Sequence, residues 1–209
     1  MMKPVCGPRL EIDEPTESEL AWIYEALQSP EIHLPLSCPS PPTRAQFDAG
    51  QIETVERGER GVLMPRFFVG RSCKSGDPVA FFLDFGWEGP FDTVRDLDLA
   101  IPERGVPIWT YVEANLMFGI YLFRHRLARR VRWRVAQERF GELSWYDRIG
   151  ARRLTHFDEP HPTSGEPIAK IIYEVSPAEY DAFLALAGLS LDQESDTYDI
   201  PWRKLMRQR

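Results

Sequence analysis

Hydrophobic and polar residues alternate most clearly in the segment from residue 95 to residue 101. Apolar side chains occupy every second position: Leu97, Leu99 and Ile101. Acidic side chains stand between them: Asp96 and Asp98. A period of two residues is typical of a β-strand with one buried face. Pro102 cannot donate a hydrogen bond to a neighbouring strand, so the strand is predicted to end in a turn over residues 102–105.

The residues after this turn have the period of a helix. Between residues 108 and 123, apolar side chains recur at spacings of three and four: Trp109, Val112, Leu116, Ile120 and Phe123. Further apolar residues widen the stripe, which predicts a largely buried helix with Pro107 in its first turn. Residues 129–136 alternate again and predict a strand parallel to the first, because a helix of this length usually connects parallel neighbours. A short helix ending at Gly150 follows.

The N-terminal part of the chain predicts one strand and two helices. Residues 9–13 alternate between apolar and polar side chains, as a short strand does. Capping boxes at Thr16 and Thr43 each predict the start of a helix. The second of these helices is expected to run to about Arg57. The Pro- and Ser-rich residues 29–42 form the loop between the two helices.

The rest of the chain predicts four more strands and a last helix. Residues 66–73 and 77–87 are rich in apolar and aromatic side chains and are separated by a hairpin turn. Residues 152–160 and 168–176 predict a second pair of strands. Ser176 begins the last helix as its N-cap.

The length of 209 residues and the mass of 24.2 kDa allow one domain with a substantial core. We expect this domain over residues 1–189 and a loosely attached tail over residues 190–209. The formal net charge of −7 argues against binding to a phosphate backbone, and therefore against a nucleic-acid partner.

The cysteines argue against two kinds of site. Cys6, Cys38 and Cys73 are odd in number and far apart, unlike a disulfide framework or a zinc site, and they fit a reducing cytoplasm. The N-terminus lacks the apolar core of a signal peptide. Residues 106–123 are the only candidate for a membrane span, but they include Glu113 and are short for a bilayer. We therefore predict a buried core helix there and no membrane partner.

The order of these segments resembles the GNAT superfamily of acyl-CoA-dependent N-acyltransferases over most of residues 9–186. In that family a strand leads through a basic, Gly-rich turn into a helix. A second strand leads into a short helix with a Tyr four residues before a Gly, here Tyr146 and Gly150. The resemblance implies an α/β fold with a mixed, twisted sheet of about seven strands, helices on both faces, and a splay where the central parallel strands separate.

The resemblance also implies acetyl-CoA as co-substrate, with its pyrophosphate on backbone N–H groups of the turn and on the helix N-terminus. The residues that would form this site are Ile101, Arg104, Gly105, Val106 and Ile108. Two residues depart from the family pattern, because Pro107 replaces a Gly and lacks an N–H, and Trp109 replaces a small residue. The alternative is a plain strand-to-helix turn without a ligand.

Three residues are candidates for proton transfer under this resemblance. Tyr146 matches the position of an acid that protonates the leaving thiolate, a step suited to a phenol, whose pKa is about 10. The alternative for Tyr146 is a core position without a chemical role. Asp96 and Asp98 would accept the amine proton, with Asp84 and Glu88 as substitutes.

The charged residues of these segments also have simpler, structural explanations. Asp96 and Asp98 are equally suited to a cross-strand ladder with the arginines of the second strand: Arg130, Arg132 and Arg134. The arginines from 124 to 130 either contact the CoA 3′-phosphate or face solvent. Residues of metal-ligand type also gather in one segment: His156, Asp158, Glu159 and His161. No third ligand has a defined place there, so we predict a hairpin rim and no metal.

The activity implied by the resemblance is transfer of an acyl group, expected to be acetyl, from CoA to a primary amine on a small molecule or peptide. The protein would be cytoplasmic, and the pattern is compatible with a homodimer. Direct attack by the amine is expected, because no Ser–His or Cys–His pair has the spacing for a covalent route. Two alternatives stay open: a catalytically inactive GNAT-like module that binds acyl-CoA, a peptide or a protein, and an acyltransferase with a different donor.

Overall fold

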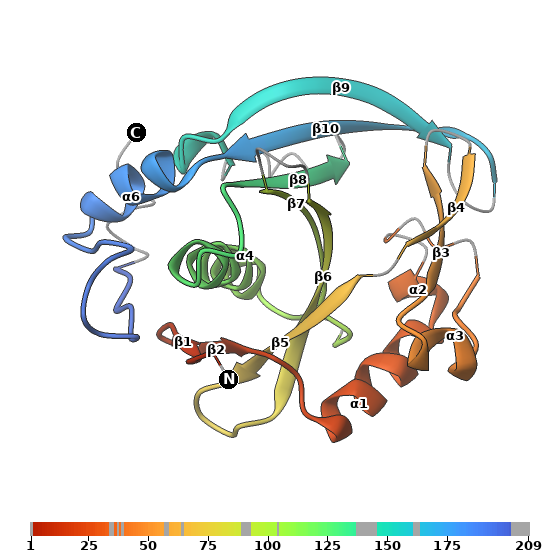
Figure 1. The fold of residues 1–209 in the computed structure, drawn as a ribbon, viewed down its shortest axis with the longest axis horizontal. Coiled ribbons are helices and arrows are strands. Elements are labelled where there is room, and N and C mark those ends of the chain that lie inside the picture. Colours follow the sequence, from red (N-terminus) through yellow and green to blue (C-terminus); the bar gives the residue numbers. More distant parts are fainter. Residues whose placement is uncertain are drawn as a thin grey trace.

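The computed structural model describes residues 2–33, 36, 38, 40–56, 59–63, 65–88, 93–103, 105–136, 146–160 and 164–201. Eight strands form one sheet in the order β1-β2-β5-β6-β7-β8-β10-β9 (Figure 1). Their bounds are β1 Val5–Cys6, β2 Leu10–Asp13, β5 Arg66–Ser72, β6 Pro78–Glu88, β7 Thr93–Ala100, β8 Arg130–Ala136, β9 Arg152–Pro160 and β10 Pro167–Val175. The predicted mixed sheet is confirmed, and β1 is a short strand that the residue pattern did not predict.

The two central strands, β7 and β8, are parallel, as predicted. Their register runs from Val94 opposite Arg130 to Leu97 opposite Trp133. The remaining residues of β7 continue to pair with β6, and those of β8 continue to pair with β10. The strands therefore separate after Leu97 and Trp133, which confirms the predicted splay.

One face of the sheet packs against helix α4 (Ile108–Arg124), and the sheet curves around this helix (Figure 1). Phe82 of β6 and Trp133 of β8 belong to the core cluster on this face. Helix α6 (Pro177–Ala185) joins the same cluster through Tyr180. The predicted long helix is thus buried between the sheet and α6, as its wide apolar stripe requires.

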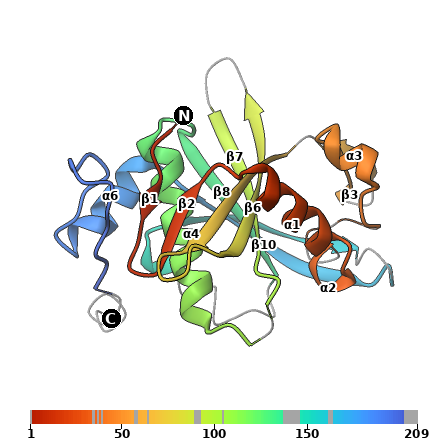
Figure 2. The same ribbon diagram turned by 90° about the horizontal axis from the view of Figure 1, so that it is seen from below.

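The opposite face of the sheet is covered by three helices. Their bounds are α1 Glu17–Leu27, α2 Pro30–His33 and α3 Arg44–Asp48. Phe81 and Leu83 of β6 form a second core cluster with Ile23 of α1 and Phe47 of α3. Because strand side chains alternate between faces, β6 supplies both clusters from neighbouring positions. Figure 2 shows these helices apart from α4 in a second view, and helices on both faces are therefore confirmed.

Three helices begin at caps that the sequence predicts. At Thr16, Thr43 and Ser176, the side-chain hydroxyl accepts a hydrogen bond from the backbone N–H three residues later. The Glu or Gln at that later position accepts from the N–H of the cap residue in return. These reciprocal bonds satisfy N–H groups that the start of a helix leaves without an intrahelical acceptor.

One predicted helix is wrong in length. The helix expected to reach Arg57 ends at Asp48. Gly50 then adopts a φ of 67°, and β3 (Ile52–Glu56) pairs with β4 (Glu59–Leu63) in a separate two-stranded sheet. A Gly in the left-handed region commonly ends a helix, and β-branched residues of β3 favour a strand. These two local signals prevail over the apparent helical continuation.

An acidic residue inside the apolar helix α4 has a structural explanation. Glu113 is fully buried, and its Oε1 accepts hydrogen bonds from Arg9 N at 2.7 Å and Leu10 N at 3.1 Å. These bonds attach the turn between β1 and β2 to α4. A Cβ added to Gly7 would lie 2.9 Å from the same oxygen, so a larger residue at this position would press on the Glu113 carboxylate. Among the described helices, α4 included, none combines the length and the apolar character that a membrane span requires.

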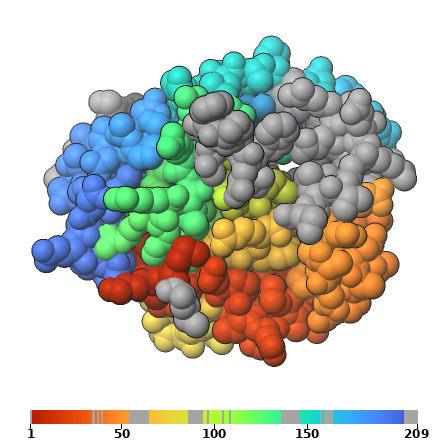
Figure 3. All heavy atoms as spheres, viewed as in Figure 1, coloured from red at the N-terminus to blue at the C-terminus, as the bar shows by residue number. Residues whose placement is uncertain are grey.

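The residues after α6 are not loosely attached, contrary to the prediction, as far as they are described. We call residues 190–201 the C-terminal strap. Three of its side chains are buried in the core: Leu191, Tyr198 and Ile200. Cys6 N donates to Asp196 O at 2.9 Å, and Tyr198 N donates to Cys6 O at 2.7 Å. Figure 3 shows blue atoms of α6 and the strap beside green atoms of α4.

Candidate functional site

The turn between β7 and α4 is open. Gly105 has a φ of 76°, a left-handed conformation that favours Gly. A Cβ built on Gly105 would meet no heavy atom of the described chain within 4 Å. Gly105 and Pro107 are exposed, and Trp109 keeps 40% of its surface exposed. The indole and the proline ring therefore lie at the surface and leave the backbone of the turn accessible.

The N-terminus of α4 adjoins this turn. Pro107 is the N-cap of α4, one position before its predicted place in the first turn, and it makes no side-chain capping bond. The N–H groups in the first turn of a helix have no intrahelical acceptor. The helix has 17 residues, and its dipole places partial positive charge at this end. Such a helix end is suited to an anionic group.

Most of the residues predicted for the cofactor site lie at this end of α4. Gly105 and Val106 form the turn, and Ile108 is the first helical residue. Ile101 is 5% exposed and packs in the core cluster around α4, so its side chain has a structural role. Arg104 lies outside the described residues.

Tyr146 lies beside the position at which β8 leaves β7. It begins a helical turn over residues 146–148 and is buried in the same core cluster as Trp133. Its ring is centred 5.3 Å from the Trp133 ring and stacks on the Tyr173 ring at 4.9 Å. Trp133 is the last residue of β8 in register with β7. Tyr146 is therefore packed in the core, as expected of a residue without a chemical role, but it also lies beside the splay, where an acid would act.

Asp98 lies on the part of β7 that has separated from β8, on the other face of the sheet. Its neighbour Leu97 packs in the cluster around α4, so alternation directs Asp98 toward the face covered by α1, α2 and α3. Cys38 follows α2 and is close to Asp98. Burial, followed by the charge of Asp98, raises the pKa of Cys38 to about 12. The half-buried Asp98 thus lies near Cys38, on the face of the sheet that α1, α2 and α3 cover.

Asp96 stands opposite Arg132 in the register of β7 and β8, and its side chain lies outside the description. Arg132 Nε donates to Oε2 of Glu174 in β10 at 2.8 Å. Arg130 and Arg152 donate to Glu174 Oε1 at 3.1 Å and 2.6 Å. Glu174 is 1% exposed, so one buried carboxylate holds three arginines. The predicted ladder omitted Glu174, because β10 becomes the neighbour of β8 only in the folded sheet.

Asp84, considered as an alternative to Asp96 and Asp98, is less suited to take a proton from an amine. Asp84 is fully buried, and its Oδ2 lies 3.5 Å from Arg95 Nη1. Arg95 Nε also donates to Leu127 O at 3.0 Å, which fixes the guanidinium in place. A carboxylate held in a buried ion pair is a poor base, because protonating it would leave the arginine charge unbalanced. The Glu88 side chain lies outside the described part of β6.

The other charged residues considered above are Arg124 and the residues of metal-ligand type on β9. Arg124 donates to Asp196 Oδ1 of the strap at 2.6 Å, so it neither faces solvent freely nor approaches the α4 N-terminus. His156 and Asp158 are exposed on β9. Across the described ranges, no group of three or more residues of metal-ligand type comes together. His161 lies outside those ranges.

The cysteines are free thiols with raised pKa values. Burial, with a smaller contribution from the charge of Glu11, raises the pKa of Cys6 to about 11. Burial is also the main cause of the raised pKa of Cys73. Together with Cys38, these thiols stay protonated near neutral pH, and a protonated thiol is a poor nucleophile.

No protein-family model and no curated protein sequence matches the chain. Solved structures do match it. An acetyltransferase of the GNAT family from Bacillus anthracis has a TM-score of 0.59 at 14% identity, over 83% of this chain and 98% of that chain. A GCN5-related N-acetyltransferase from Brucella melitensis has a TM-score of 0.57 at 17% identity, over 91% of each chain.

A third match is a chimera of the Vibrio cholerae spermidine N-acetyltransferase SpeG and hSSAT. It has a TM-score of 0.58 at 12% identity, over 82% of this chain and 98% of that chain. These likenesses extend over most of the chain. The chain therefore has the fold of the GNAT-family acetyltransferases.

Proposed function

We propose that this protein is an N-acetyltransferase that moves an acetyl group from acetyl-CoA to a primary amine. The observation that carries the proposal is the open turn at Gly105, which links the splayed end of β7 to the start of α4. The fold shared with solved acetyltransferases supports it. In this proposal, the helix N-terminus receives the pyrophosphate, and the splayed strand pair next to it receives the thioester.

In this proposal the pyrophosphate of acetyl-CoA lies at the turn. Gly105, Val106 and Ile108 each keep a backbone N–H, whereas Pro107 has none and reduces the number of donors. Arg104 adds positive charge next to them. The N-terminus of α4 contributes its partial charge and the N–H groups of its first turn.

The proposed reaction is direct attack of the neutral amine nitrogen on the thioester carbonyl carbon. The C–N bond forms and the C–S bond breaks, giving an N-acetyl amine and CoA. The departing thiolate takes a proton from Tyr146, and the amine loses a proton to Asp98, directly or through water. Solvent then restores both side chains to their starting states. Tyr146 belongs to the α4 face and Asp98 to the opposite face, so donor and acceptor approach the splay from different sides.

Direct transfer fits the described thiols better than an acyl-cysteine intermediate. Cys38 lies near Asp98, but its pKa of about 12 leaves almost no thiolate at neutral pH. A nucleophilic cysteine needs a lowered pKa or an adjacent base. The environment of Cys38 has the opposite effect, because burial and a nearby negative charge both disfavour the thiolate.

The acceptor is proposed only by class. Solved structures with this fold are named for spermidine, aminoglycoside and phosphinothricin acetylation. One fold thus serves unlike amines and does not select among them. We infer a primary amine that reaches Asp98 from the side of α1, α2 and α3.

The test is acetyl-CoA-dependent acetylation of a panel of primary amines, followed through the release of free CoA thiol. The wild type is expected to turn over at least one amine. Tyr146→Phe should lower kcat by about a hundredfold or more while leaving the KM for acetyl-CoA nearly unchanged, since an acid acts in the transition state. Asp98→Asn should lower kcat/KM for the amine. Tyr198→Phe removes a buried phenol hydroxyl from the strap and is the matched control, with kcat unchanged.

The outcomes separate the hypotheses. Full activity of Tyr146→Phe would remove the acid role and support the core interpretation of that residue. Binding of acetyl-CoA without turnover of any amine would favour a non-catalytic binding module. Neither binding nor turnover at millimolar acetyl-CoA would overturn the proposal.

A further inference from the structure

Trp133 occupies the point at which the sheet opens. It is the last residue of β8 in register with β7, opposite Leu97. From the next residue on, β8 pairs only with β10 among the described strands. Trp133 is 3% exposed, and its Nε1 is buried without a hydrogen-bond partner among the described residues.

A buried donor without an acceptor is unusual and needs a physical reason. The N–H of an indole loses its hydrogen bond to water on folding, and an unmade bond costs free energy that a phenyl ring would not incur. Most buried side-chain donors in proteins have a protein or water partner, and tryptophan generally finds one. A ligand that enters the opening is one way to supply the missing acceptor.

The surroundings hold the Trp133 ring in place. Tyr173 stands opposite Trp133 in the register of β10 and β8. Tyr146 stacks on Tyr173 and lies 5.3 Å from the indole, measured between ring centres. The indole is thus held by Tyr173 of β10 and by Tyr146, the residue proposed as the acid. A donor with so little freedom loses little entropy when it binds an acceptor.

We propose that the indole N–H of Trp133 donates a hydrogen bond to a carbonyl oxygen of bound acyl-CoA at the opening between β7 and β8. The inference rests on the proposed function, because it concerns the same site. A neutral donor is suited to a neutral carbonyl oxygen, and both the thioester and the pantetheine amides of acyl-CoA carry one. Trp133 then positions the donor substrate, and it stabilises the oxyanion if the acceptor is the thioester oxygen.

Tyr121 provides a matched control. Its hydroxyl is also buried without a hydrogen-bond partner among the described residues. Its ring contacts Phe68 of β5, on the other side of β6 and β7 from β8. Tyr121→Phe and Trp133→Phe therefore each remove one buried donor and keep an aromatic ring, but only the second change lies at the opening.

The experiment measures the acetyl-CoA dissociation constant and the steady-state constants of the wild type and both variants. We expect Trp133→Phe to lower either the affinity for acetyl-CoA or kcat by about three- to tenfold, the usual effect of one neutral hydrogen bond. Tyr121→Phe should match the wild type in both. A loss in affinity with kcat unchanged assigns the bond to a pantetheine amide. A loss in kcat assigns it to the thioester.

A second measurement observes the ligand effect on the wild type itself, and the Trp133→Phe variant is needed only to assign the resonance. In a ¹⁵N-labelled sample, the indole N–H resonance of Trp133, assigned by its absence in Trp133→Phe, should move downfield when acetyl-CoA is added. Acetyl-CoA that binds without moving this resonance, together with wild-type constants for Trp133→Phe, would overturn the inference and leave the proposed function standing. A wild type that does not bind acetyl-CoA would overturn both.

Discussion

Gly119 of α4 lies directly against Tyr180 of α6. A Cβ added to Gly119 would stand 2.5 Å from Tyr180 Oη and 2.7 Å from Cζ. Tyr180 is fully buried, and its hydroxyl donates to Leu116 O at 2.8 Å. This hydrogen bond fixes the ring across α4 at the height of Gly119, so only a hydrogen atom fits between the two helices.

Gly119→Ala is therefore expected to destabilise the protein by about 1–3 kcal/mol, the usual range for overpacking a core. Helix propensity alone predicts the opposite sign, because Ala favours a helix interior over Gly by about 1 kcal/mol. Urea unfolding of the wild type and the variant measures the difference. In a Tyr180→Leu background the same substitution should lose its penalty. A stabilising Gly119→Ala in the wild-type background would contradict the packing described here.

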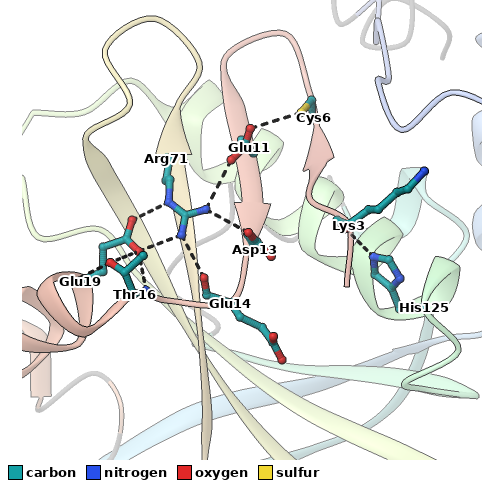
Figure 4. A network of polar contacts seen from close by, with 9 residues as sticks. All are labelled: Lys3, Cys6, Glu11, Asp13, Glu14, Thr16, Glu19, Arg71 and His125. Carbon is teal, nitrogen blue, oxygen red and sulfur yellow. Dashed lines mark hydrogen bonds and ion pairs between the residues drawn. The ribbon is translucent and has the colours of Figure 1, made fainter. Parts of the chain in front are cut away.

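Arg71 of β5 joins the start of α1 to the neighbouring strand β2 (Figure 4). Its Nη2 donates to Glu19 Oε2 at 2.8 Å, and its Nη1 lies 3.4 Å from Asp13 Oδ2. Burial by itself raises the pKa of Glu19. The hydrogen bonds from Arg71 and Thr16 outweigh burial and lower the pKa to about 2.

The lowered pKa of Glu19 predicts the sign of a pH effect on stability. A carboxyl group whose pKa is about 2 when folded and near 4.5 when unfolded stabilises the fold above pH 4.5. This contribution falls as the pH drops from about 4.5 to 2. Glu19→Gln should thus destabilise the protein at pH 7 and approach the wild type near pH 2.

Urea unfolding at several pH values measures this prediction. Glu17→Gln changes an exposed carboxylate in the same helical turn, and its effect should stay within about 0.5 kcal/mol at neutral pH. A stability difference between Glu19→Gln and the wild type that does not depend on pH would show that the Arg71 contact does not lower the pKa of Glu19.

One arginine at the end of α4 contacts the strap at several points. Arg124 donates to Gln193 O and Tyr198 Oη at 2.9 Å each, and to Asp196 Oδ1 at 2.6 Å. Arg124→Met keeps much of the apolar stem but removes these donors. It should cost about 2 kcal/mol, because three partly buried acceptors lose a charged partner.

Limited proteolysis gives a direct measure of strap attachment. Arg124→Met should make residues 190–201 much more sensitive to cleavage than in the wild type. Arg126→Met changes a nearby exposed arginine and should leave the cleavage rate unchanged. Equal cleavage of both variants would mean that other contacts hold the strap.

The parts of the fold that the sequence predicts depend on neighbours in the chain. The caps at Thr16, Thr43 and Ser176 each involve residues three apart, and all are present. The parallel pairing of β7 and β8 follows from the length of the helix between them. Such features need no knowledge of distant partners, which is why the pattern of residues is sufficient.

The features that the sequence does not predict depend on distant partners. Glu174 holds Arg132 only because β10 inserts next to β8. The strap has no regular apolar period, and its attachment is made by Arg124 and by the backbone of Cys6. The role inferred for Trp133 comes from an indole N–H at the splay that has no hydrogen-bond partner among the described residues, and residue spacing has no signal for that.

Binding of acetyl-CoA at the turn before α4 can be tested by titration calorimetry, because two glycines of the chain allow a matched comparison. Gly105 and Gly76 have φ values of 76° and 78°, and neither would bring a Cβ within 4 Å of described atoms. Gly76 lies in the turn between β5 and β6, so Gly76→Ala imposes similar backbone strain away from the proposed site.

Acetyl-CoA should bind the wild type and Gly76→Ala equally. It should bind Gly105→Ala about tenfold or more weakly, because the new methyl group occupies the surface to which the pyrophosphate must come close. Equal affinity of the two variants, or no heat of binding to the wild type at millimolar acetyl-CoA, would contradict the assignment of this turn.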